Sequence, residues 1–379
     1  MNKDNAVKKG GVLAIDAGAG STRVGWFRDG EKIFDEKISH DPEKLAQLGD
    51  LMDQDRYRRD AVLGLLESKD VRLEDIDIIM ARGGLFAPVH TGVYKVNRDM
   101  RDVLLTCRDG VHACNLSAVV ADDIAEMVTE ARPGSPCSAY IADAPMADEM
   151  LPECRIGGLP EFPRRAFFHD LNSRAALKKY LTEKGLSAEG VTAIVVHLGH
   201  GITVSVHRDG RIIDTNNGLG GDGPFTMERA GTCPAFPLVE MCFSGRYTEA
   251  EVKMKLMGRG GAVAYFGTAD PAAIIARAEG GDRDAKLFLE AYSLNVAKYI
   301  ASGAATVCGK ADAVILTGDG AAFPEITDAI ARRVEFIAPV SVYPGEHNID
   351  SLSENGYGVL AGTIPVHRYD KNAIVSDEE

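Results

Sequence analysis

Apolar residues along this chain follow two periods in alternation, that of a buried strand and that of an amphipathic helix. The short apolar runs that predict strands are residues 76–80, 139–142, 193–196 and 313–316. The longer stretches with helical spacing are residues 42–68, 112–130, 248–257, 284–308 and 324–334. Strands that alternate with helices are typical of α/β proteins, so the predicted fold class is α/β with mixed sheets.

One supersecondary unit occurs twice. Residues 15–22 and residues 196–203 each end a strand in a glycine turn, and each leads into a second strand, an Asp-Gly turn and a third strand. The glycines of the first turns match at an offset of 199 − 18 = 181 residues, whereas those of the Asp-Gly turns match at 210 − 30 = 180. A repeated unit of this kind predicts two duplicated domains.

The paired glycine turns also indicate a ligand. Glycine lets a backbone approach a phosphate closely, and successive N–H groups form an anion-binding concavity. We therefore expect two such turns to bind one polyphosphate in a cleft between the domains. The residues expected to bind the nucleotide or its phosphates at these turns are Gly18, Gly20, Ser21, Thr22, His197, Gly199, His200 and Gly201.

Two further features extend this nucleotide site. The loop Gly318-Asp319-Gly320 lies between a predicted strand and a predicted helix, where a nucleotide phosphate is commonly bound. Asp16 ends the first strand and is a candidate Mg²⁺ ligand, since Mg²⁺ prefers carboxylates and water; capping of the glycine turn is the alternative role. The phosphate-binding pattern G-x-x-x-x-G-K-[ST] is absent from the chain.

Bulk properties exclude several classes of protein. A length of 379 residues predicts two domains, and 45% hydrophobic content predicts ample core. The formal charge of 42 − 56 = −14, without a run of five basic residues, excludes a long nucleic-acid footprint. We expect no membrane partner either, because no apolar run reaches bilayer length. Seven scattered cysteines with no C-x-x-C pair and no signal peptide predict a cytoplasmic protein.

Several blocks of the chain resemble one family. His197-x-Gly199-x-Gly201-x-Thr203 is similar to a signature of the acetate/butyrate kinases. Other blocks similar to the butyrate kinases are Gly83-Gly84-Leu85, Phe168-His169, Gly223-Pro224-Phe225, Glu228-Arg229 and Tyr343-Pro344-Gly345-Glu346. The resemblance covers nearly the whole chain. It implies two duplicated ribonuclease H-like domains of the actin/hexokinase type and a reaction between ATP and a short-chain fatty acid that gives an acyl phosphate. It also implies Mg²⁺ as cofactor and a homodimer or larger homo-oligomer.

The same resemblance implies roles for individual residues. Arg82 and Arg229 match the arginines that hold the carboxylate and the transferring phosphoryl group, although a structural salt bridge is the alternative for either. His169 matches the histidine that contacts the phosphoryl group, and Asp143 the aspartate that organises the site with Mg²⁺. The acid pocket is expected from Arg82, Phe86, Pro88, Val93 and Asn115, and the metal ligands from Asp16, Asp143 and Glu346.

The resemblance assigns residues 1–165 to an N-terminal acid-binding domain and residues 166–379 to a nucleotide-binding domain, with about the last 20 residues packing back on the first. The chain differs from the family pattern at Asp16, His200, Asp319 and His347-Asn348. Three functions therefore stay open: a carboxylate kinase acting on butyrate or a branched-chain relative, a related enzyme with another substrate or ATPase activity, and a non-catalytic nucleotide-binding protein.

Overall fold

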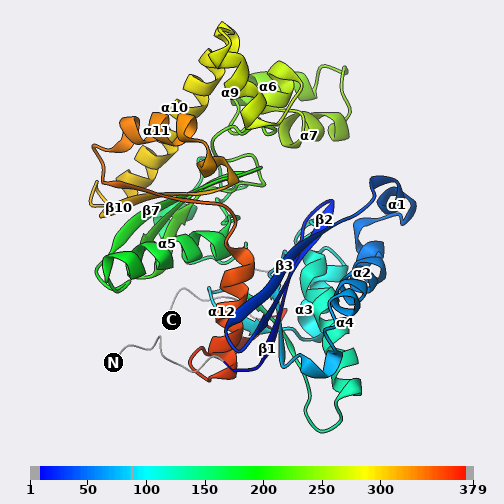
Figure 1. Cartoon of the computed structure of the whole chain (residues 1–379). Helices are drawn as coiled ribbons and strands as arrows, with labels where there is room; N and C mark the ends of the chain where they lie inside the picture. The colour runs from blue at the N-terminus through cyan, green and yellow to red at the C-terminus, as the bar shows by residue number, and fades with distance from the viewer. Residues whose placement is uncertain (1–8, 87–88, 373–379) are drawn as a thin grey trace. The chain divides into compact units, whose positions relative to one another are not determined.

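The computed structural model describes residues 9–86 and 89–372, so Pro88, one of the expected pocket residues, lies outside the described residues. The chain divides into two compact units (Figure 1). The first unit joins the residues up to Asp148 with those from His347 onward, and the second unit runs from Glu149 to Glu346.

The first unit contains a seven-stranded mixed sheet with the order β12-β5-β6-β4-β1-β2-β3. Its strands are β1 (Gly11–Ala17), β2 (Ser21–Arg28), β3 (Glu31–Ser39), β4 (Ile78–Arg82), β5 (Val93–Lys95), β6 (Ala139–Ala142) and β12 (Val366–Arg368). Strand β1 pairs antiparallel with β2 and parallel with β4, which in turn pairs parallel with β6. The carboxyl ends of β1, β4 and β6 therefore meet at one edge of the sheet.

Helices cover both faces of this sheet. They are α1 (Pro42–Gln47), α2 (Asp55–Ser68), α3 (Arg98–Leu105), α4 (Asn115–Ala131) and α12 (Asn348–Leu360), with 3₁₀ turns η2 (Leu51–Gln54) and η3 (Leu73–Asp75). Leu13 and Ile15 of β1 belong to the core formed with α2 and α4. On the opposite face, α12 approaches so closely that a Cβ on Gly356 would lie 2.8 Å from Val12 Cγ1. Successive residues of β1 thus point to opposite faces, and both faces are buried.

The second unit contains a five-stranded sheet with the order β11-β10-β7-β8-β9. Its strands are β7 (Thr192–Leu198), β8 (Ile202–Arg208), β9 (Arg211–Thr215), β10 (Ala313–Gly318) and β11 (Val340–Pro344). Its helices are α5 (Asp170–Lys184), α6 (Ala235–Cys242), α7 (Glu249–Met257), α8 (Gly261–Phe266), α9 (Pro271–Glu279), α10 (Arg283–Thr306) and α11 (Pro324–Val334), with η4 (Pro152–Arg155) and η5 (Asp319–Ala322).

Strand β7 also has two buried faces. Ala193 and Val195 pack with α5, whereas Ile194 and Val196 pack in the core that includes α10 and α11. Figure 1 shows α5 on one side of this sheet and α10 and α11 on the other. The continuous apolar run that predicts this strand is explained by this sandwiching between helices.

The two units share one strand plan. The order β3-β2-β1-β4-β6 in the first unit repeats as β9-β8-β7-β10-β11 in the second, with the same parallel and antiparallel pairings. A register shift follows Trp26 in one sheet and Val206 in the other, 206 − 26 = 180 residues later. Asp29 and Asp209 both have positive φ, of 49° and 54°, in their Asp-Gly turns. The predicted α/β class and the predicted duplication are confirmed.

The structure also locates the change of offset between the two copies. The last pair of the first hairpin is Ala17 with Thr22, whereas that of the second is Leu198 with Ile202. The first glycine turn is therefore one residue longer than the second, and the change from 181 to 180 lies inside the turn.

The division between the units falls earlier in the chain than residue 165. Met150 and Cys154 pack with Phe168 and Ile212 of the second unit, and the Leu151 N–H donates to the Ile213 carbonyl. Residues 149–165, expected as a connecting segment, are thereby part of the second unit. Within the described ranges, no helix is long and apolar enough to cross a membrane.

Candidate active site

In the first unit, three expected site residues lie at one edge of the sheet. Asp16 is in β1, Arg82 ends β4, and Asp143 directly follows β6. Pairing of Ile15 with Ala81, and of Arg82 with Ala142, places these three residues at the carboxyl ends of three neighbouring strands. Open α/β sheets bind ligands at such an edge.

Asp16 is the centre of this cluster. Arg82 Nη1 lies 3.3 Å from Asp16 Oδ1, and Asn348 Nδ2 donates to Asp16 Oδ2 at 2.8 Å. The side chains of Arg82 and Asp16 are 22% and 12% exposed, so solvent reaches both. The cluster therefore presents one guanidinium and one carboxylate to an incoming ligand.

The first glycine turn is held from below by Arg58, a residue that the sequence analysis did not identify. Arg58 is fully buried on α2, and its Nη1 and Nη2 donate to the carbonyls of Gly18 and Ala19, both at 2.8 Å. The Gln54 side chain accepts from Arg58 Nη2 at 2.9 Å. Burial lowers the pKa of the Arg58 guanidinium. Its role is to fix the backbone of the turn so that the turn's N–H groups stay oriented.

The described residues of the expected acid pocket are buried. Phe86 and Val93 are 0% and 1% exposed. Asn115 Oδ1 accepts from the Leu85 N–H at 2.7 Å, and its Nδ2 donates to the Gly110 carbonyl at 3.0 Å. Asn115 thus braces the loop that follows Arg82.

In the second unit, two histidines stack beneath the glycine turn. The rings of His169 and His197 lie 3.6 Å apart with an 11° interplanar angle. Asn172 Nδ2 lies 2.8 Å from His197 Nδ1, and Glu346 Oε1 lies 3.1 Å from His197 Nε2. Because the amide nitrogen can only donate, His197 Nδ1 accepts and the ring proton is on Nε2, facing Glu346. His169 Nδ1 lies 3.0 Å from the Thr203 hydroxyl, so both rings have fixed orientations.

Arg229 lies against the second glycine turn. A Cβ on Gly201 would fall only 2.4 Å from Arg229 Nη1, so the guanidinium occupies the space that the glycine leaves. Arg229 Nη1 also donates to the Gly218 carbonyl at 2.6 Å. Burial lowers the pKa of Arg229, while the neighbouring Glu228 acts in the opposite direction.

The third glycine loop reaches the same turn. Gly318 has φ of 87°, and a Cβ there would lie 2.6 Å from the Leu198 carbonyl oxygen. Asp319 and Gly320 open the 3₁₀ turn η5. The second unit therefore gathers His197, Gly201, Gly318 and Arg229 near the carboxyl ends of β7 and β10.

Comparisons with known proteins identify the family. A model of the acetokinase family matches residues 164–338. The chain is 40% identical over 358 residues to butyrate kinase 2 of Clostridium acetobutylicum, which covers 94% of this chain and 99% of that relative. A probable butyrate kinase of Bacteroides thetaiotaomicron is 39% identical over 359 residues, covering 94% and 99%. The chain belongs to the acetokinase family.

Solved structures agree on the fold of this acetokinase. The acetate kinase of Porphyromonas gingivalis has a TM-score of 0.72 at 15% identity, covering 93% of this chain and 100% of that one. A propionate kinase of Francisella tularensis has a TM-score of 0.71, also at 15% identity, covering 91% and 98%.

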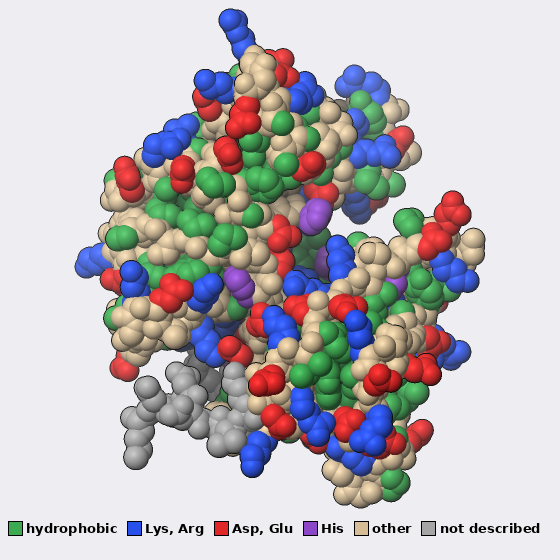
Figure 2. Space-filling view, viewed as in Figure 1, with side chains coloured by type: hydrophobic (Ala, Val, Ile, Leu, Met, Phe, Trp, Pro, Cys, Tyr) green, Lys and Arg blue, Asp and Glu red, His purple; other side chains and the backbone are tan. Residues whose placement is uncertain are grey.

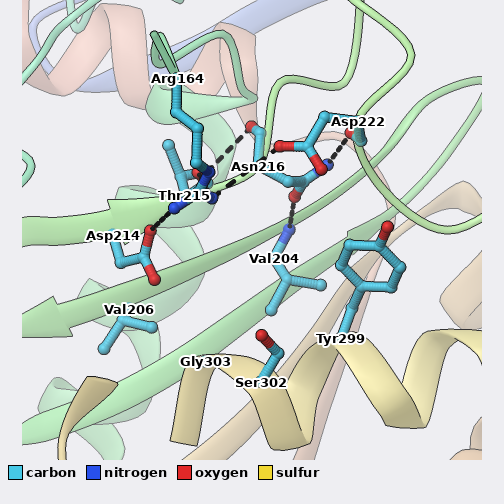
Figure 3. Close-up of a pocket in the computed structure, with 10 residues that line it drawn as sticks. All are labelled: Arg164, Val204, Val206, Asp214, Thr215, Asn216, Asp222, Tyr299, Ser302 and Gly303. Carbon is cyan, nitrogen blue, oxygen red and sulfur yellow. Dashed lines mark hydrogen bonds and ion pairs between the residues drawn. The ribbon is translucent and has the colours of Figure 1, made fainter. Parts of the chain in front are cut away.

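A cavity of about 210 Å³ in this acetokinase lies behind the glycine-rich loop of the second unit (Figure 3). Arg164 donates to Asp214 Oδ1 at 3.1 Å and to the Thr215 carbonyl at 2.9 Å. Asp214 also accepts from the Thr306 hydroxyl at 2.8 Å. These charged groups are engaged with each other, so the cavity supports β9 and the loop that leads to Arg229.

The expected metal ligands fall in different units. Asp16 and Asp143 belong to the first, whereas Glu346 belongs to the second and contacts His197. Within residues 9–86 and 89–372, no three His, Cys, Asp or Glu side chains are grouped closely enough to hold a metal ion among themselves.

Two of the unexpected residues left a signal in the sequence. Arg58 is spaced four residues from Val62 and eight from Leu66, so a charged residue occupies the apolar stripe of its helix. Asn172 directly follows the Phe168-His169 block and lies one turn into α5. Asn348 gave no such signal, because its partner Asp16 is 332 residues away in the chain.

Proposed function

We propose that this acetokinase transfers the γ-phosphoryl group of ATP reversibly to a short-chain fatty acid, butyrate or a branched-chain relative, giving an acyl phosphate and ADP. The observation that carries the proposal is the near-complete match, at 37–40% identity, to proteins named butyrate kinase. The four residues assigned to the chemistry, Arg82, Asp143, His169 and Arg229, are all present.

The acid would bind through the first unit. Arg82 ends β4 with a partly exposed guanidinium, whose forked N–H groups suit the two oxygens of a carboxylate. Asp16 and Asn348 fix the position of that guanidinium from one side. The apolar chain of the acid would pack against the buried Phe86 and Val93 side of the loop.

The nucleotide would bind through the second unit. The backbone N–H groups of Gly199 and Gly201, with the Gly318 loop, are assigned to its phosphates. Arg229 and His169 are assigned to the transferring group, where fixed donors stabilise developing charge without reorganisation. The role of His197 is to hold His169 by stacking, since its own ring is fixed by Asn172 and Glu346.

Mg²⁺ is part of the proposal. Mg²⁺ commonly binds one or two carboxylates and completes its shell with water and phosphate oxygens, so a site without three clustered side chains suits it. Asp16 and Asp143 in the first unit and Glu346 in the second are the candidate ligands. When bound, Mg²⁺ would neutralise charge on the nucleotide phosphates.

A hydroxamate assay tests the proposal. Purified protein with ATP, Mg²⁺, butyrate and hydroxylamine should form butyryl hydroxamate, and Arg82→Gln should lose this product while still binding ADP. Absence of product with every linear and branched acid from C2 to C6 would contradict the proposal. ATP turnover that is independent of any acid would instead favour the ATPase alternative.

Two further expectations accompany the activity. The homo-oligomer implied by the family is tested by sedimentation analysis of the purified protein. On the face shown in Figure 2, acidic and basic side chains are interspersed, in keeping with a small-molecule substrate rather than a nucleic acid.

A further inference from the structure

His200 forms the tip of the second glycine turn and carries an ion pair. Its Nδ1 lies 3.2 Å from Glu228 Oε1. The His200 side chain is 82% exposed, whereas that of Glu228 is 26% exposed. The imidazole therefore reaches out of the turn and back to a carboxylate next to Arg229 in the chain.

A second connection joins the same two segments. The Thr226 hydroxyl donates to the His200 carbonyl at 2.8 Å and accepts from the N–H groups of Glu228 and Arg229 at 3.1 and 3.0 Å. The tip of the turn and the loop that carries Arg229 are thus tied together by backbone as well as by side chains. A change at His200 is transmitted directly to Arg229.

Arg229 has no carboxylate bound to its guanidinium among the described residues. Its Nη1 donates to the Gly218 carbonyl, and its Nε is buried without a hydrogen-bond partner in the described part of the chain. The nearest acidic side chain in sequence, Glu228, is turned to His200 instead. The positive charge of Arg229 is therefore left for a ligand.

We propose that His200 is a positioning residue whose imidazolium form holds Glu228 away from Arg229, so that the second glycine turn keeps a net positive charge for the nucleotide phosphates. This inference rests on the proposed function and adds a pH-dependent element to its nucleotide site.

The charges facing His200 decide the direction of the effect. They are the carboxylate of Glu228, the guanidinium of Arg229 and the carboxylate of Asp319 from η5. The hydrogen bond to Glu228 is the main cause that raises the pKa of His200, and burial opposes it. Protonated His200, Glu228 and Arg229 sum to +1, whereas neutral His200 leaves them at zero and frees Glu228 to pair with Arg229.

Nucleotide affinity should therefore fall as pH rises through the pKa of His200. One unit of charge about 6 Å from a phosphate, in the mixed environment of a protein surface, changes affinity about threefold to tenfold. His200→Gln should bind ADP more weakly at pH 6 and lose this part of the pH dependence. His367→Gln removes an exposed histidine of β12 in the first unit and serves as the matched control, with the wild-type pH profile.

The experiment measures the dissociation constant of ADP by calorimetry from pH 6 to pH 8.5 for wild type, His200→Gln and Glu228→Gln. Because ADP itself titrates equally in every sample, the difference between the curves isolates the protein. NMR of labelled histidine should also show the pKa of His200 falling in Glu228→Gln, a shift that a merely structural contact would not produce.

The two proposals fail separately. Parallel ADP curves for wild type and His200→Gln, or an unchanged His200 pKa in Glu228→Gln, would overturn the role of His200 even if butyryl hydroxamate is formed. A divergent pair of curves without any hydroxamate would support the role of His200 and contradict the proposed kinase activity.

Discussion

Replacement of Gly201 by alanine tests whether the second glycine turn exists to seat Arg229. No positive φ is required at Gly201, so the backbone accepts alanine. The new Cβ would lie 2.4 Å from Arg229 Nη1 and 3.1 Å from Arg229 Cζ. Ordinary contacts with carbon begin near about 3.5 Å, so the guanidinium must move by roughly 1 Å.

The size of the effect follows from this displacement. A misplacement of about 1 Å in a reacting group can lower turnover about 100-fold, and we expect kcat/KM to fall by that order. The Arg229 bond to Gly218 would weaken, at a cost of about 1.5–3 kcal/mol. Removal of glycine from the unfolded chain offsets about 0.4–1 kcal/mol of this loss. The free energy of unfolding should therefore decrease by only about 1–2 kcal/mol.

The assay compares hydroxamate formation and urea unfolding for Gly201→Ala and Gly158→Ala. Gly158 also lies in the second unit, and a Cβ there would meet nothing within 4 Å, so this variant should keep wild-type activity and stability. In the first turn, a Cβ on Gly20 likewise meets nothing within 4 Å, so Gly20→Ala should leave the free energy of unfolding nearly unchanged. Wild-type kcat/KM in Gly201→Ala would refute the seating of Arg229 by this glycine.

Three other perturbations have defined outcomes. Arg58→Met should lower the free energy of unfolding by about 2–4 kcal/mol in urea titrations, because the Gly18 and Ala19 carbonyls lose their donor; an unchanged midpoint would contradict its bracing role. Burial lowers the pKa of His40 to about 4 and that of His207 to about 3, so the unfolded chain binds more protons below pH 6.5. Stability should therefore fall from pH 7 to pH 5 by about 2 kcal/mol for each histidine, and His40→Asn should reduce that slope. Asn348→Asp places a second carboxylate beside Asp16, so its urea midpoint should be lower than wild type by more at pH 8 than at pH 5; equal losses would exclude charge repulsion.

The duplicated architecture could be predicted because it depends on local signals. Glycine turns, Asp-Gly turns and strand-length apolar runs report on adjacent residues, and the structure confirms the repeated strand order that they indicate. The family prediction is confirmed by the full-length relatives. Even the one-residue change of offset was visible, although only the register of β1 with β2 and β7 with β8 places it in the glycine turn.

The contacts that orient the site could not be predicted in the same way. Arg58 is buried because three backbone carbonyls of a distant turn need a donor, and that need is not visible in the sequence of α2. The Asp16–Asn348 hydrogen bond joins the two ends of the chain because α12 returns to the first sheet. The roles of Arg82, Arg229, His169 and Asp143 stay predictions until variants are assayed.

Phosphorus NMR of the working reaction tests the account most directly. With wild-type protein, ATP, Mg²⁺ and butyrate, the account predicts that signals of butyryl phosphate and ADP grow in equal amounts, and that Arg82→Gln and Arg229→Gln, still folded, produce neither at a comparable rate. Growth of ADP with inorganic phosphate alone, at the same rate with or without butyrate, would contradict it.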